Sequence, residues 1–224
     1  AFESPYAFVF GLFVLYYVYR YQWMRAAIAI VFMFLAHKRI AVLAVAICLL
    51  GMLLMKLLKY GKKWVMIGWS GVIAAVGLYL YSIFSGILVN ICEFFHINTK
   101  SRISVYMQIA EAIPEKYYLG YGMGSGNELL SQLLSSCKLE RWFQNPHNDF
   151  LKLYMEVGII GLALFLSSYF LFFLIGEKKL TKQALSQLFI MIAYFMFLMT
   201  TDNISIYILF LIPMYSICYA LMKE

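Results

Sequence analysis

The sequence predicts an all-α polytopic membrane protein with about seven transmembrane helices and one long, partly helical outer loop. Of its 224 residues, 64% are hydrophobic and only 13% are charged, whereas a soluble domain is about half apolar and about a quarter charged. The apolar residues also gather into segments close to the length of about 20 residues that crosses a bilayer. One long interruption, roughly residues 84–148, separates the first segments from the last.

The apolar segments divide the chain into three parts. In chain order they are Pro5–Tyr19, Gln22–Ala36, Ile40–Leu58, Trp64–Ile83, Asp149–Ile175, Ala184–Thr200 and Ile204–Met222. We therefore expect four spans in residues 1–83, an extracytoplasmic loop in 84–148 and three spans in 149–224, with the first two spans short. Because the chain starts at Ala1 without an initiator Met, we expect the C-terminal part of a longer membrane protein.

The basic residues orient these spans, because Lys and Arg gather in cytoplasmic loops. They cluster after the first, third and fifth segments and at the C-terminus: Arg20, Arg25, Lys56, Lys59, Lys62, Lys63, Lys178, Lys179, Lys182 and Lys223. All four positions agree with seven alternating spans and a cytoplasmic C-terminus. The net charge of +7 is thus an orientation signal, and we expect no nucleic-acid partner.

Two cations depart from this distribution. Lys38 and Arg39 lie in a short predicted outer turn between two apolar segments. A charge there costs a few kcal/mol unless it reaches the interface or is paired. The pair either anchors the helices among the lipid headgroups or binds an anionic ligand on the outer face.

The outer loop is predicted to hold two helices. In SRISVYMQIAEAI the apolar residues recur at helical spacing, Ser101 is a plausible N-cap and Pro114 ends the pattern. We expect this amphipathic helix to lie along the membrane surface. Arg102 occupies its first turn, where the helix dipole favours anions, and this misplaced cation hints at a ligand. A second helix is expected from about Glu128 to Ser136.

Four alternating glycines lie between these two helices, in YYLGYGMGSGNELL. They indicate either a tight loop packed against a neighbour or a flexible segment. The stretch matches neither the Walker loop nor the dinucleotide-binding fingerprint. The chain also has no DxD, no HExxH and no His/Cys cluster.

The return to the membrane, RWFQNPHNDFLKLYMEVGIIGLALFL, carries a histidine and then a carboxylate. Asn145 is predicted as the N-cap and Pro146 as the first helical residue. His147 would then lie in the first turn, where the dipole favours a neutral imidazole able to accept a proton. The alternative is an ordinary helix cap at the water interface. Glu156 follows inside the apolar stretch, where it needs an Arg, a Lys or backbone donors as partner.

Three stretches resemble the O-antigen ligase and polymerase family, in matching order. HNDFLKLYMEVGIIGLALFL resembles its C-terminal signature, a His-Asn or His-Ser pair before a span bearing Leu, Glu and Gly. SRISVYMQIAEAIPEKYYLGYGMGSG resembles its outer-loop segment, and AHKRIAVLAVAICLL resembles its Ser-Arg-headed span. His37 and Lys38 stand where the family has a small residue and Ser. The resemblance extends over about residues 1–220.

The resemblance implies the C-terminal part of a GT-C-like inverting glycosyltransferase in the bacterial cytoplasmic membrane. Its donor would be a glycan on undecaprenyl diphosphate, used on the outer face, and its other partners a glycan acceptor and membrane lipids. We expect a polysaccharide polymerase, with an O-antigen ligase acting on lipid A-core as the alternative. Neither a cofactor nor a metal is expected.

The same resemblance assigns roles to the unusual residues. Arg39 and Arg102 would bind the diphosphate, with Lys38 as a lesser candidate, because guanidinium groups bind phosphates well. His147 would be catalytic, as a base or in contact with the diphosphate. The supporting residues would be Asn148, Glu156 and Asp202.

Two other classes of protein remain open. A transporter or flippase often contains inverted repeats and helices broken near the midplane, whereas the unusual charges here lie at the predicted outer interface. A structural polytopic subunit would leave Arg39, Arg102, His147 and Glu156 dispensable.

Overall fold

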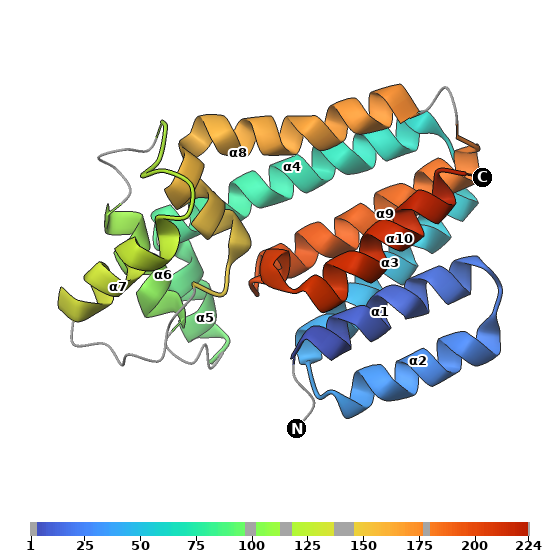
Figure 1. The fold of residues 1–224 in the computed structure, drawn as a ribbon, viewed down its shortest axis with the longest axis horizontal. Coiled ribbons are helices and arrows are strands. Elements are labelled where there is room, and N and C mark those ends of the chain that lie inside the picture. Colours follow the sequence, from blue (N-terminus) through green and yellow to red (C-terminus); the bar gives the residue numbers. More distant parts are fainter. Residues whose placement is uncertain (1–3, 97–101, 113–117, 137–145, 177–179, 224) are drawn as a thin grey trace. The chain divides into compact units, whose positions relative to one another are not determined.

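The computed structural model describes residues 4–96, 102–112, 118–136, 146–176 and 180–223. Within these ranges the chain forms helices and no strands (Figure 1). The elements are α1 (Ser4–Tyr19), α2 (Trp23–Leu35), α3 (Arg39–Leu57), α4 (Lys62–Phe84), α5 (Ile87–Phe94), α6 (Arg102–Ala112), α7 (Gly126–Ser136), α8 (Asp149–Gly176), α9 (Lys182–Met199), the 3₁₀ helix η2 (Ile204–Ile206) and α10 (Ile208–Leu221).

All seven predicted apolar segments are helical where they are described. Four helices, α3, α4, α8 and α9, are long and apolar enough to cross a membrane, whereas α1, α2 and α10 are shorter apolar helices. The chain is therefore a multi-pass membrane protein with an all-helical fold. Seven as the number of crossings stays a prediction, as does the GT-C-like architecture.

The helices belong to two compact units, and the predicted three-part division of the chain stays a prediction. Residues 1–72 and 169–224 form the first unit, and residues 73–168 form the second. The boundaries fall within α4 and α8, because each of these long helices packs one part of its length into either unit. The second unit contains the described residues between α4 and α8 together with the adjoining parts of these two helices.

α9 is the core of the first unit. It packs against α1, α3 and α10, and most of its residues are buried, as expected of a helix that is apolar on all sides. It is joined to α1 by the Tyr194 hydroxyl, which donates a hydrogen bond to Phe8 O at 3.0 Å. Gly11 makes room for this hydroxyl, because a Cβ there would collide with it.

The second unit contains both predicted loop helices and one more. α6 agrees with the helix predicted after Ser101, although Ser101 and Pro114 themselves lie outside the described residues. α7 begins at Gly126, two residues before the expected Glu128. α5 was not predicted, because its apolar residues continue the pattern of the preceding span.

α8 is broken at Gly158, which corrects the prediction of one continuous span over Asp149–Ile175. Gly158 has φ 65° and ψ −170°, a conformation that is essentially restricted to glycine. A break inside a helix frees backbone groups that must find other partners. Here the glycine-rich segment (residues 118–126) provides them. Three hydrogen bonds join the two segments: Tyr121 N to Met155 O at 2.8 Å, Gly122 N to Glu156 O at 2.9 Å, and Ile160 N to Tyr118 O at 3.3 Å.

Candidate functional site

The start of α8 positions His147, and it differs from the prediction. The helix begins at Asp149, and the buried Asn148 caps it, with its Oδ1 accepting from Leu151 N at 3.0 Å. Pro146 is therefore not the first helical residue, and the predicted cap Asn145 lies outside the described residues. Since His147 precedes the cap and has φ 50°, it is not in the first helical turn. The predicted effect of the helix dipole on the His147 imidazole required a place in that turn, so it no longer applies.

A pair of tyrosines, Tyr79 of α4 and Tyr106 of α6, holds this turn in place. Asn148 Nδ2 donates to the Tyr79 hydroxyl at 3.0 Å, and the Tyr106 hydroxyl donates to His147 O at 3.0 Å. The two tyrosine hydroxyls also share a hydrogen bond. A left-handed conformation is uncommon for a residue other than glycine, so this network explains how His147 keeps it.

Arg102 belongs to the same cluster. It lies one helical turn before Tyr106 on α6, and residues four apart occupy the same face of a helix. Its positive charge acts on the Tyr79 hydroxyl, which in turn contacts Asn148. The second unit thus brings together Arg102, His147 and Asn148, three of the predicted site residues, from α6 and the start of α8.

Glu156 contacts the backbone at the start of α7. Its Oε1 accepts a hydrogen bond from Gly126 N at 3.2 Å, at the start of α7, where the helix dipole stabilises a carboxylate. Backbone donors were one of the predicted classes of partner. Because α8 breaks two residues later, Glu156 does not lie within an unbroken span. It fixes α7 and the glycine-rich segment against α8.

Of the two alternatives predicted for the glycine-rich segment, the structure shows the tight loop, which packs against the backbone of α8. A Cβ at Gly120 would lie 2.5 Å from Glu156 O, and one at Gly158 would collide with Tyr118 O. Both glycines also have positive φ. Glycine at these two positions is therefore required by the close approach of two backbones.

The remaining predicted site residues belong to the first unit. Lys38 Nζ lies 3.0 Å from Asp202 Oδ2, and Asp202 is only 1% exposed. Asp202 Oδ1 accepts from Asn203 N and from the Tyr207 hydroxyl, both at 2.9 Å. Lys38 is thus a counter-ion for a buried carboxylate, whereas the neighbouring Arg39, the first residue of α3, is exposed. Among the described residues the Arg39 guanidinium has no ion-pair partner, so Arg39 is the better candidate of the two for an anionic ligand.

Sequence reasoning did not single out Tyr79 and Tyr106. Each is a tyrosine in an apolar pattern, a position usually filled for packing. The only available signal was the spacing of Arg102 and Tyr106, which shares one helix face. Among the described residues no three His, Cys, Asp or Glu side chains are grouped to hold a metal. Metal independence stays a prediction.

One of the three comparisons with known proteins finds a match. Neither the curated proteins nor the solved structures include a match to this chain. A family model described as O-antigen ligase matches residues 24–166. That range covers more than half of the chain and includes Arg39, Arg102, His147 and Glu156. The chain belongs to the O-antigen ligase family.

Proposed function

We propose that the protein is a polysaccharide polymerase, which transfers a glycan from undecaprenyl diphosphate to a glycan acceptor on the outer face of the bacterial cytoplasmic membrane. The family indicates O-antigen ligase or polymerase-type activity with lipid-linked glycan substrates in a membrane. The O-antigen ligase that uses lipid A-core as acceptor is the alternative within the same chemistry.

The observation that carries the proposal is the cluster of Arg102, Tyr79, Asn148 and His147. Glycan transfer from a lipid diphosphate needs positive charge for the leaving group and a base for the acceptor. Arg102 offers a permanently charged guanidinium group, which can bind a phosphate through two hydrogen bonds at once. His147 offers an imidazole, and the hydrogen bond from Tyr106 fixes the backbone of this residue.

In the proposed step the acceptor hydroxyl oxygen attacks the anomeric carbon while the bond between that carbon and the diphosphate oxygen breaks. This attack from the opposite face inverts the configuration. His147 takes the proton of the hydroxyl, and Arg102 compensates the charge that develops on the diphosphate. Arginines can supply the charge that a metal supplies in other transferases, so the proposal includes no metal and no cofactor.

The supporting residues act through position. Asn148 fixes the turn that carries His147, and Glu156 fixes the segment that follows α6. Arg39 and Lys38 stay predictions as diphosphate ligands, and the ion pair with Asp202 makes Lys38 the lesser of the two.

The basic loops support the proposed orientation. Lysines gather between α3 and α4 and before α9, and Lys223 ends the chain's last described stretch. By the positive-inside rule these loops and the C-terminus are cytoplasmic. The turn at Lys38 and the segment around His147 are then on the outer side, where a translocated lipid-linked glycan would be available.

The test is a product analysis with purified protein in proteoliposomes. The probe is a synthetic polyprenyl diphosphate that carries one glycan repeat unit, without added divalent metal and with EDTA. A ladder of chains longer by whole repeats supports the polymerase. A single transfer to added lipid A-core with no ladder supports the ligase instead. Movement of unchanged donor across the bilayer, without any new glycosidic bond, would favour a transporter and contradict the proposal.

A further inference from the structure

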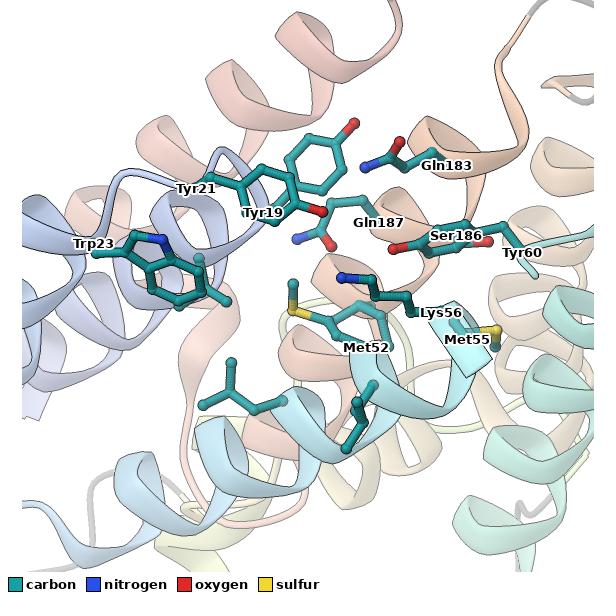
Figure 2. Close-up of a pocket in the computed structure, with 14 residues that line it drawn as sticks. Tyr19, Tyr21, Trp23, Met52, Met55, Lys56, Tyr60, Gln183, Ser186 and Gln187 are labelled. Atoms are coloured by element: carbon teal, nitrogen blue, oxygen red, sulfur yellow. The ribbon is translucent and has the colours of Figure 1, made fainter. Parts of the chain in front are cut away.

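A pocket opens at the end of the first unit that carries the lysines (Figure 2). It lies between the turn that joins α1 to α2, the turn that joins α3 to α4, and the first turns of α9. Its volume of about 200 Å³ is several times the roughly 30 Å³ that one water molecule occupies in the liquid. We call this cavity the inner pocket. The polar side chains that line it include Tyr19, Tyr21, Lys56, Tyr60, Gln183 and Gln187.

Gln187 places a buried amide in the inner pocket. Its side chain is only 3% exposed, and its Nε2 has no hydrogen-bond partner among the described residues. A buried amide without a partner destabilises the fold, so such groups usually have a ligand or water. Figure 2 shows the Gln187 amide directed into the space that Lys56 and Tyr19 also face.

The polar side chains that share the inner pocket with this amide can donate hydrogen bonds, and one of them, Lys56, carries a positive charge. Lys56 Nζ lies 5.7 Å from the centre of the Tyr21 ring, a cation–π contact that holds the ammonium at the mouth of the pocket. Burial, and to a lesser degree Tyr21, raises the pKa of the Tyr60 hydroxyl, against a smaller opposing effect of Lys56. Tyr60 therefore keeps its proton at neutral pH and can donate it to an anion.

The rest of the pocket is apolar. Leu49, Met52 and Ile190 line it, and their side chains belong to helices of the membrane-embedded bundle. The pocket thus combines a cationic, donor-rich end with an aliphatic wall. Tyr21 and Tyr60 both have positive φ, of 56° and 44°, and strained backbone of this kind often occurs where a fold grips a ligand.

We infer that the inner pocket binds an anionic phospholipid, with the phosphate held by Lys56 and Gln187 and an acyl chain against the aliphatic wall. A soluble phosphate compound would not use that wall, and a zwitterionic lipid would bring its own cation to Lys56. Basic pockets between helices are common sites for such headgroups on the cytoplasmic side. Only the assignment to the cytoplasmic leaflet rests on the proposed orientation; the pocket is separate from the cluster around His147.

Native mass spectrometry of the detergent-purified chain tests this inference. The probes are dioctanoyl phosphatidylglycerol, dioctanoyl phosphatidylcholine and glycerol 3-phosphate. We expect phosphatidylglycerol to bind about tenfold more tightly than phosphatidylcholine, because the choline cation would lie close to the Lys56 ammonium and repel it, and glycerol 3-phosphate to bind more weakly still. Equal binding of the two lipids, or equal binding of glycerol 3-phosphate, would overturn the inference.

Two variants and a matched control locate the site. Lys56→Gln removes the charge and Gln187→Leu removes the amide at similar volume, and each should weaken phosphatidylglycerol binding about tenfold. Lys59→Gln removes a neighbouring charge outside the pocket and should change it less than twofold. Gln187→Leu should also leave the lipid-free protein at least as stable, because the unpartnered amide is gone. If neither variant binds more weakly than Lys59→Gln, the lipid lies elsewhere and the inference fails.

Discussion

Replacing Gly158 by Ala should detach the glycine-rich segment from α8. Gly158 has a backbone conformation that is open to glycine and almost closed to other residues. The added Cβ would also collide with the backbone oxygen of Tyr118. Because the colliding atom belongs to the backbone, a side-chain rotation cannot relieve the contact. Either α8 straightens or the segment at Tyr118 moves away.

The size of the effect follows from what that movement breaks. A residue forced into this region of φ and ψ costs about 1–3 kcal/mol. Each of the three hydrogen bonds between residues 118–122 and 155–160 contributes about 1 kcal/mol when it is lost. We therefore expect Gly158→Ala to lower the free energy of unfolding by roughly 4–6 kcal/mol.

The assay is thermal unfolding of the purified chain in detergent, followed by near-UV circular dichroism. Gly71→Ala is the matched control, because Gly71 lies within α4 and a Cβ there meets nothing within 4 Å. That variant should be unchanged or more stable by up to about 1 kcal/mol, since Ala favours a helix over Gly. We expect the midpoint of Gly158→Ala to fall by roughly 10 °C relative to this control.

Gly120→Ala should behave like Gly158→Ala, because its Cβ would meet the same contact from the other side. If both variants unfold within 2 °C of Gly71→Ala, the two backbones do not approach as described. The account of the broken helix, and with it the placement of Glu156, would then be wrong.

Three further substitutions test the site and its supports. Tyr106→Phe removes the hydrogen bond to His147 O and should lower kcat about tenfold with little change in KM; an unchanged kcat would show that the fixed turn is not needed. Glu156→Gln keeps the acceptor for Gly126 N but loses the charge, so it should cost at most about 1 kcal/mol of stability, while Glu156→Ala should cost more in the same thermal assay. Lys38→Met leaves Asp202 buried without its cation and should cost roughly 3 kcal/mol; adding Asp202→Asn should restore part of this loss, and strictly additive effects would contradict the ion pair.

The sequence was sufficient for the apolar helices and the two loop helices α6 and α7, and insufficient for α5 and for the break in α8. Apolar segments of near-membrane length identify spans directly, because the bilayer imposes both length and composition. The break at Gly158 depends on residues 118–122, far away in the chain, whose backbone replaces the missing helical partners. Gly158 alone, within an apolar run, indicates close helix packing equally well.

The sequence singles out candidate residues for the site but not the contacts between them. Arg102 and His147 stand out as a misplaced cation and an interfacial histidine. The tyrosine pair that links them does not, because Tyr79 and Tyr106 resemble ordinary apolar-face residues. The start of α8 was misplaced because both Asn145 and Asn148 suit an N-cap, and only the contacts of Asn148 with Leu151 N and Tyr79 decide between them.

The most direct test of the central claim is the rate of glycan transfer by His147→Asn beside His96→Asn, in proteoliposomes with the lipid-diphosphate repeat unit. His96 is exposed and has the same φ of 50° as His147, and asparagine tolerates that conformation. Both substitutions therefore make the same chemical change without backbone strain. The account predicts that His147→Asn lowers the rate about 10²–10⁴-fold while His96→Asn leaves it unchanged. Equal rates for the two variants would contradict a catalytic role of His147.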